Sequence, residues 1–301
     1  MSSLSIVGSP TALGGHFAGM ERGPRALRDA GLLDRLRSVP ALAGVDLVDT
    51  GDVPNDPGWA PDPDPRAKNR ALIAAYLPRV RDHVAAALAG ASGSRLLILG
   101  GDCTSHSGTM AGLAKAEPGS RFGIAWFDAH GDLNTPDTTP SGNVWGMPFA
   151  MLLGWGEPDL VGACDGPTAR EEDAALLGGQ VLDEQESRMQ AASQVALFGA
   201  GMLATDAGMA ALEGWARVVG ARCDGLYIAF DLDALDASEG LSVAMPEPDG
   251  LSLETAARAM ETIARHATVV GFGPTATMPR PELDVRVNVE AIARLSQAAF
   301  G

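Results

Sequence analysis

Short apolar runs alternate with alanine-rich stretches along most of the chain. The runs cover residues 4–8, 45–49, 95–100, 122–127, 194–199, 225–230 and 268–273. Their β-branched and aromatic residues are typical of strands, whereas the stretches between them are typical of helices. Regular alternation of the two predicts a mostly parallel sheet that is covered on both faces. We therefore expect a doubly wound, three-layer α/β/α sandwich.

Two further segments give clear predictions. Residues 54–66, PNDPGWAPDPDPR, must form a loop because prolines recur throughout. Residues 67–90 are predicted to form a helix that Pro78 kinks, and the last helix is expected over 282–299. No change in composition marks a linker, and a chain that is 46% hydrophobic can bury a large core. We expect one domain over residues 1–301.

Composition excludes several classes of protein. The formal charge of -16 argues against binding to a phosphate backbone, so no nucleic-acid partner is expected. The absence of an 18-residue apolar run argues against a membrane helix, and the start of the chain does not have the pattern of a signal peptide. A cytoplasmic location is expected. The three cysteines are widely spaced, which predicts reduced thiols and no disulfide framework.

Candidate chemistry begins directly after the run at 122–127. Asp128, His130 and Asp132 occupy alternate positions there. In an extended backbone such side chains point the same way, so they could converge on a hard divalent cation. Taken alone, the motif could also be a solvated turn.

A second acidic pair follows another apolar run. Asp231 and Asp233 come after residues 225–230 and also alternate. Alone, this pair could bind calcium or be merely solvated. Together, two strands that end in carboxylates predict one shared site at the carboxyl edge of a parallel sheet. Five such ligands could hold two metals about 3.5 to 4 Å apart, which make a bound water nucleophilic at neutral pH. Hydrolysis is the expected chemistry.

Three blocks carry a resemblance to a known family. GGDCTSHSG at 100–108, DAHGDLNTPDTTPSGN at 128–143 and DLDALDAS at 231–238 resemble segments of arginase, in the ureohydrolase family that includes agmatinase. Residues 9–33 and 45–54 are similar to the family's first strand, loop and helix and to its second strand. The resemblance covers nearly the whole chain.

The resemblance implies roles for individual residues. The manganese ligands would be Asp128, His130, Asp132, Asp231 and Asp233. Asp132 would also orient the bridging hydroxide, and Asp132 and His130 are the expected catalytic residues. Positions that bind the α-carboxylate of an amino acid match Asn134, Thr139, Ser141 and Asn143, and the weaker alternative is that this segment is a plain turn. The resemblance also implies a small-molecule substrate and a homo-oligomer, either a trimer or a hexamer.

The chain departs from the family pattern at Cys103. Most ureohydrolases have a histidine ligand at this position. A thiolate ligand is softer than imidazole, so zinc, iron or nickel become alternatives to manganese for the two divalent ions. A similar replacement is a feature of N-hydroxyarginine hydrolase, a family member that releases hydroxyurea. Alternatively, Cys103 is a small buried thiol beside a one-metal site, and His106 could then substitute as a ligand.

Three more departures concern the substrate. Trp145 stands where the family has its proton-shuttling histidine, and His16 is a candidate replacement. Ala276 stands where a glutamate grips the guanidinium, and Met245 replaces a threonine, so this end of the pocket is expected to be apolar. In the region expected to bind an α-amino group, residues 199–208, only Asp206 offers a carboxylate.

Several functions remain open on this basis. The first is a metal-dependent hydrolase of a C–N bond in a guanidino, modified guanidino or amidine substrate, with N-hydroxyarginine as the best single guess. The second is a catalytically silent relative that serves as a binding or oligomer partner, which the departures at Cys103, Trp145 and Ala276 would explain. An ordinary arginase or agmatinase is the third.

Overall fold

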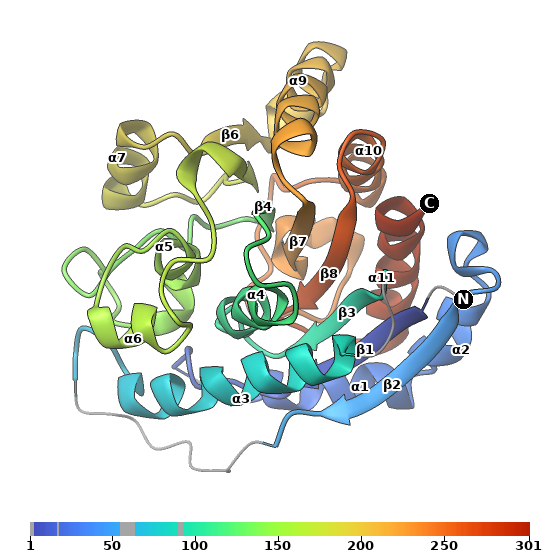
Figure 1. The fold of residues 1–301 in the computed structure, drawn as a ribbon, viewed down its shortest axis with the longest axis horizontal. Coiled ribbons are helices and arrows are strands. Elements are labelled where there is room, and N and C mark those ends of the chain that lie inside the picture. Colours follow the sequence, from blue (N-terminus) through green and yellow to red (C-terminus); the bar gives the residue numbers. More distant parts are fainter. Residues whose placement is uncertain (1–2, 17, 55–63, 90–92) are drawn as a thin grey trace.

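One sheet of eight strands forms the centre of the molecule (Figure 1). The computed structural model describes residues 3–16, 18–54, 64–89 and 93–301. The strands are β1 (Ser3–Ser9), β2 (Asp46–Asp52), β3 (Arg95–Gly100), β4 (Phe122–Asp128), β5 (Ala174–Gly178), β6 (Ala196–Gly199), β7 (Gly225–Asp231) and β8 (Val269–Thr275). Their order is β2-β1-β3-β8-β7-β4-β5-β6, and all neighbours run parallel.

Helices cover both faces of this sheet (Figure 1). One face carries α1 (Gly23–Asp29), α2 (Leu32–Arg37), α9 (Asp206–Arg222), α10 (Leu253–Ala264) and α11 (Val285–Phe300). The other carries α3 (Arg70–Leu88), α4 (Ser105–Ala116), α5 (Pro148–Leu152) and α6 (Pro158–Gly162). Two further helices are α7 (Glu184–Ala192) and α8 (Ala200–Leu203), which come before and after β6 in the chain, and α7 lies near β6 in Figure 1. The predicted three-layer α/β/α sandwich is confirmed.

Alternation along the strands divides the core into two layers. Leu97 and Leu99 of β3 pack into the cluster beneath α9 to α11, whereas Leu96 and Ile98 pack into the cluster beneath α3 and α4. Successive side chains of a strand point to opposite faces, so a strand covered on both sides must be apolar throughout. This explains why β3 appears in the sequence as an unbroken apolar run.

Seven strands coincide with the predicted runs, but β5 was not predicted. Its sequence, AALLG, consists largely of good helix formers, yet all five residues are buried between β4 and β6. The predicted helix at 67–90 is observed as α3, with Pro78 inside it. The predicted last helix is observed as α11. Asp284 caps its amino-terminal end, where the Asp284 side chain accepts a hydrogen bond from Arg286 N. Most of the predicted loop at 54–66 lies outside the described residues.

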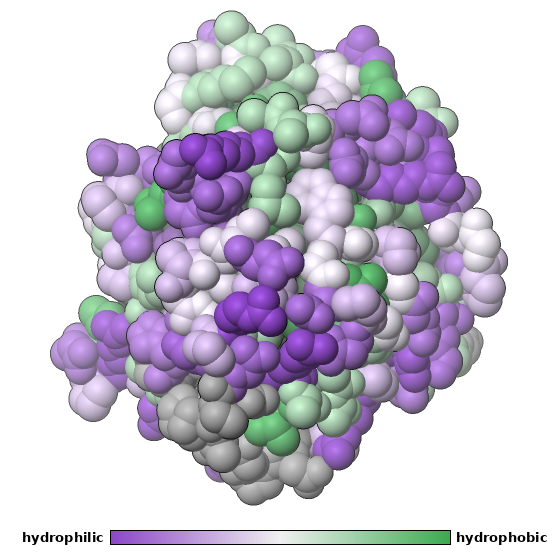
Figure 2. Space-filling view, turned by 90° about the vertical axis from the view of Figure 1, so that its left-hand side faces the viewer, coloured by the Kyte–Doolittle hydropathy of each residue, from purple (hydrophilic) through white to green (hydrophobic). Residues whose placement is uncertain are grey.

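The surface of the molecule is mainly polar on the side shown in Figure 2, with scattered small apolar areas. This is the side that lies at the left of Figure 1, near α5, α6 and α7. None of the described helices is both long and apolar enough to cross a membrane.

The carboxyl ends of β1, β3 and β8 meet without intervening side chains. Gly101 N donates to Ser9 O at 2.8 Å, and Gly101 O accepts from Ala276 N at 2.7 Å. A Cβ atom at Gly101 would lie only 1.9 Å from Thr11 O. Glycine is therefore required at this position, and the close approach fixes where the turn carrying Cys103 begins.

Replacing Gly101 with alanine should push these strand ends apart. We expect Gly101→Ala to lower the free energy of unfolding by about 2 to 3 kcal/mol, as overpacking of a tight site does. Gly214→Ala is the matched control, because a Cβ at this position in α9 meets nothing within 4 Å. Urea unfolding of both variants measures the difference. Equal stability of the two variants would show that the Gly101 contact can relax without cost.

Candidate metal centre

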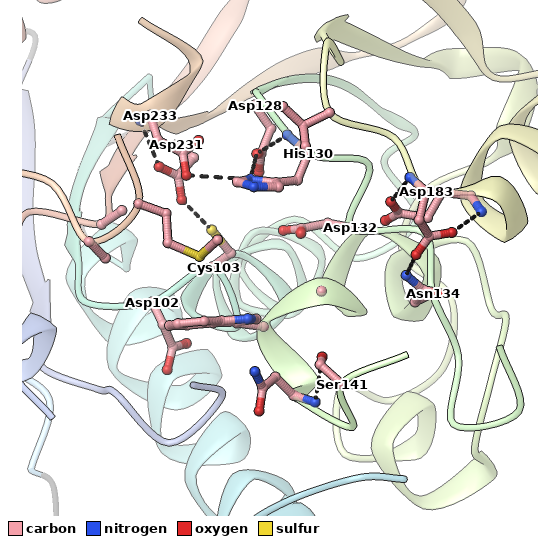
Figure 3. Close-up of a pocket in the computed structure, with 18 of the residues that line it drawn as sticks. Asp102, Cys103, Asp128, His130, Asp132, Asn134, Ser141, Asp183, Asp231 and Asp233 are labelled. Atoms are coloured by element: carbon pink, nitrogen blue, oxygen red, sulfur yellow. Dashed lines mark hydrogen bonds and ion pairs between the residues drawn. The ribbon is translucent and has the colours of Figure 1, made fainter. Parts of the chain in front are cut away.

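A cavity of about 460 Å³ opens at the carboxyl edge of the sheet (Figure 3). It lies where β3, β4, β7 and β8 end and is lined by side chains that follow these strands. All six residues predicted as metal ligands line it: Cys103, Asp128, His130, Asp132, Asp231 and Asp233. The structure therefore brings together residues that are up to 130 positions apart in sequence (103 to 233).

Two overlapping groups of these residues could each hold a cation. The ligand atoms of Cys103, Asp128 and Asp132 all lie within 4.8 Å of one another. The same holds for Asp128, His130 and Asp233. Because Asp128 belongs to both groups, its carboxylate could bridge two neighbouring ions. Oxygen, imidazole and thiolate donors of this kind fit divalent transition metals.

Turns, not an extended backbone, make these side chains converge. β4 ends at Asp128, whose Oδ1 accepts a hydrogen bond from His130 N at 2.7 Å. The same turn recurs after β7, where Asp231 Oδ1 accepts from Asp233 N at 2.8 Å. Asp132 has a left-handed backbone, with φ of 53°. The sequence argument assumed continued strands and was wrong on this point, because an aspartate side chain can bond the backbone two residues on and turn the chain.

The cluster carries more negative charge than its surroundings can neutralise. Burial, together with the neighbouring Asp233, raises the pKa of Asp128 to about 6. Burial and nearby carboxylates also raise the pKa values of Asp132 and Asp231 well above the usual range. For His130, burial lowers the pKa, but the adjacent Asp128 and Asp233 raise it by more. Crowded buried carboxyl groups resist ionisation unless a cation joins them.

Two polar atoms in the cluster lack hydrogen-bond partners among the described residues. They are Asp132 Oδ2 and His130 Nε2. The nearest carboxylate to His130 Nε2 is that of Glu247, at 3.6 Å, which is too far for a hydrogen bond. Buried polar atoms are normally satisfied, so these two indicate a missing partner. The residues present therefore fit two divalent cations.

Cys103 is part of the cluster, whereas His106 is not. Cys103 Sγ donates to Asp231 Oδ2 at 2.8 Å, and burial raises the pKa of the thiol well above its ordinary value. His106 does not line the cavity. Its Nδ1 lies 2.8 Å from Tyr227 Oη and its ring meets Trp126 edge-on, so it is a buried side chain of the α4 layer. The prediction that His106 could substitute as a ligand was wrong.

A polar wall rises on one side of the cluster. It includes all four residues predicted to bind an α-carboxylate: Asn134, Thr139, Ser141 and Asn143. Two carboxylates that the sequence did not identify stand beside them, Asp183 and Glu186. Asp183 Oδ2 accepts from Asn134 Nδ2 at 2.8 Å (Figure 3). Asp183 and Glu186 also form the capping box at the start of α7, so their sequence signature is that of a helix start.

Asp206, the carboxylate considered for the α-amino group, lies elsewhere. It begins α9, its side chain is fully exposed and it pairs with Arg258 at 3.6 Å. The loose match of residues 199–208 was therefore misleading, because none of these residues lines the cavity. Asp183 takes its place as the carboxylate that faces the cavity beside the polar wall.

A second part of the lining, the apolar wall, consists of apolar residues. It contains Trp145, Met20, Ala244, Met245 and Ala276. Trp145 is covered by the loop before α1, since a Cβ at Gly15 would come within 2.3 Å of its ring. Ala276 is buried and has φ of 63°. The predicted apolar end of the pocket is thus present, and no carboxylate occupies position 276.

Removing one carboxylate should stabilise the metal-free protein. The raised pKa of Asp132 means that its ionised form opposes folding, and this cost appears as pH rises above the unfolded value near 4. We expect Asp132→Asn in chelator at pH 7.5 to raise the free energy of unfolding by about 1 to 3 kcal/mol. At about pH 3, below the unfolded value, the gain should largely vanish, because the carboxyl group is then mostly protonated in both states.

Denaturant unfolding at the two pH values measures this effect. Asp137→Asn is the control, because Asp137 is exposed and pairs with Arg66. Its effect should stay within about 0.5 kcal/mol at either pH. A loss of stability in Asp132→Asn at pH 7.5 would show that the carboxylate is favourably solvated as it stands.

Known proteins share this architecture. A sequence model of the arginase family matches residues 2–299. Arginase from Bacillus caldovelox is 34% identical over 275 residues, covering 88% of this chain and 87% of that protein. Its native structure aligns with a TM-score of 0.87 at 32% identity, over 100% of this chain and 99% of that one. Arginase from Bacillus subtilis (strain 168) is 32% identical over 263 residues, covering 87% and 85%.

Proposed function

Because this chain belongs to the arginase family and is a hydrolase of amidine C–N bonds, we propose that it acts on an amino-acid-like substrate with a modified guanidino group. The observation that carries the proposal is the pair of overlapping ligand groups that share Asp128 at the base of a cavity with one polar and one apolar wall. The substrate we propose is N-hydroxyarginine.

Six side chains would hold two divalent cations, namely Cys103, Asp128, His130, Asp132, Asp231 and Asp233. When bound, such ions lower the pKa of water and polarise the amidine carbon. Asp132 Oδ2, which has no partner among the described residues, is placed to accept a hydrogen bond from the attacking water. His130 Nδ1 lies 3.3 Å from Asp128 and 3.4 Å from Asp233, which orient its ring. Manganese is the expected metal, and Cys103 makes zinc or iron competitive.

The polar wall would hold the amino-acid end of the substrate. Amide and hydroxyl groups of Asn134, Thr139, Ser141 and Asn143 can donate hydrogen bonds to a carboxylate. Asp183 adds a carboxylate that complements an α-ammonium group. A decarboxylated amine would leave these donors unused.

Positions 245 and 276 offer no carboxylate to a charged guanidinium, although Glu247 also lines the cavity. With alanine at 276 and methionine at 245, a cationic group at this end would be buried without a carboxylate partner from either position. N-hydroxylation lowers the basicity of a guanidine, because the electronegative oxygen withdraws electron density. A substrate of this type can enter the apolar end in its neutral form and keep its amino-acid end at the polar wall.

The same apolar residues favour a second candidate. Trp145 and Ala276 offer no acid and no carboxylate, so the chain could be a silent relative that binds a ligand or other subunits without turnover. An ordinary arginase or agmatinase is the remaining alternative. A homo-oligomer, as a trimer or hexamer, stays a prediction under each of these functions.

Metal analysis followed by a substrate panel tests the proposal. Protein purified without chelator should hold close to two divalent ions per subunit. With manganese, zinc, iron or nickel it should then hydrolyse N-hydroxyarginine with a higher kcat/KM than arginine, agmatine, guanidinobutyrate or a formimino substrate. We expect kcat/KM for N-hydroxyarginine to exceed that for arginine by at least about tenfold. This factor corresponds to the loss of one ion pair between the protein and the guanidinium of arginine.

The alternative functions give different results. Fewer than half an ion per subunit, with no turnover on any substrate, would support the silent relative. A preference for arginine or agmatine would make the chain an ordinary member of its family.

Replacing the thiol should shift the choice of metal. We expect Cys103→His to raise affinity for manganese by about tenfold or more, because imidazole suits this metal better than a thiolate. Manganese titration followed by calorimetry measures the change. Cys164→Ala is the control, because Cys164 is also buried but does not line the cavity. An unchanged manganese affinity would remove Cys103 from the ligand set.

A further inference from the structure

Two neighbouring residues tie together the loops at the rim of the cavity. Lys68 N donates to Gly142 O at 2.9 Å, and its Nζ donates to Asn143 Oδ1 at 3.1 Å. Asn69 Nδ2 donates to Leu13 O at 2.9 Å, and Asn69 holds a left-handed backbone before α3. One dipeptide thus holds both the loop that carries Asn143 and the loop before α1.

The contact between these segments is close. A Cβ atom at Gly142 would lie 1.9 Å from Pro65 O, so the backbone before Lys68 packs directly on the backbone before Asn143. Lys68 is partly buried there, whereas Asn143 is buried and lines the cavity. The ammonium group consequently approaches the cavity from behind its polar wall.

The charge of Lys68 decides which way the Asn143 amide faces. An ammonium group can only donate, so the amide oxygen must face Lys68 and the amide nitrogen must face His16. Asn143 Nδ2 lies 3.0 Å from His16 Nδ1. In a neutral ring this nitrogen must then accept, which leaves the proton on Nε2. His16 packs edge-on against Trp145, with ring centroids 5.2 Å apart, and both line the cavity.

The rest of the cavity is rich in carboxylates. Besides the metal cluster it is lined by Asp102, Asp183, Glu186 and Glu247. An anionic group of a ligand is repelled by these side chains unless a metal or a donor meets it. The rim at Asn143 offers donors backed by a positive charge, so it attracts the anionic end while the amidine end faces the cluster.

We propose that Lys68 is a specificity-determining residue of this site. By fixing the Asn143 amide and placing a positive charge behind it, Lys68 selects ligands that carry a carboxylate at the end remote from the metal cluster. The inference rests on the proposed function only in that the ligand enters with its amidine or amine end towards the cluster.

Binding of two matched ligands tests this role without requiring turnover. Ornithine and putrescine differ only in the carboxylate, so the ratio of their Kd values isolates its recognition. We expect the manganese-loaded protein to prefer ornithine, and Lys68→Met to reduce that preference by about 10- to 100-fold, the range of one charged hydrogen bond. Titration calorimetry measures the ratio, and thermal melting checks folding.

Three further variants make the test specific. Arg66→Met removes a positive charge two residues away, where the exposed Arg66 pairs with Asp137, and should leave the ratio unchanged. Lys68→Arg should keep the preference. Lys68→Gln keeps a donor for Asn143 without the charge, and a loss comparable to that of Lys68→Met identifies the charge as the cause. Lys68→Gln also serves if Lys68→Met fails to fold.

Turnover supplies a second readout. With a carboxylated substrate, Lys68→Met should raise KM by a similar factor and leave kcat within about threefold, because uniform binding is lost. An ornithine preference that is absent in the wild type, or that survives in Lys68→Met, would overturn the inference. If no substrate is turned over but the preference and its loss are both observed, the inference stands and the proposed function fails.

Discussion

Four carboxyl groups are buried together where β4 and β7 end, and their mutual repulsion is the constraint on which the rest of the structure depends. Asp128, Asp132, Asp231 and Asp233 are each at most 6% exposed. Neighbouring parallel strands end at one edge, and the pairing of β4 with β7 brings the first aspartate of each motif to that edge. Burying four carboxyl groups side by side costs free energy, so the surrounding layers must hold these groups in place until cations neutralise them.

Rigid backbone contacts provide this support. The turn after each strand is closed by the aspartate itself, and the ends of β1, β3 and β8 meet at Gly101 without side chains between them. Two apolar layers bury both faces of the sheet beneath the cluster. The site is therefore built on strand ends, and only its walls belong to longer loops.

The walls of the cavity differ in polarity. The loop from 134 to 143 offers neutral donors, and Lys68 holds that loop from behind through Gly142 and Asn143. The apolar wall, which includes Trp145, Met245 and Ala276, offers no charge. Under the proposed function, an elongated substrate would place its amino-acid end at the donors and its amidine end at the cluster. The carboxylates of the cluster are kept, so the departures from the arginase pattern at Trp145, Met245 and Ala276 concern the lining of the cavity and not the cluster itself.

The sequence by itself determined the sandwich, seven of the strands and five of the clustered residues, because apolar runs and alternating polar residues are local patterns. Cys103 was added only through the resemblance to a family block. It did not identify β5, whose alanines and leucines favour a helix until β4 and β6 enclose them. It also missed Asp183 and Glu186, which look like an ordinary capping box, and misplaced His106 and Asp206. Only the tertiary structure decided which side chains face the cavity, because orientation depends on contacts between segments far apart in the chain.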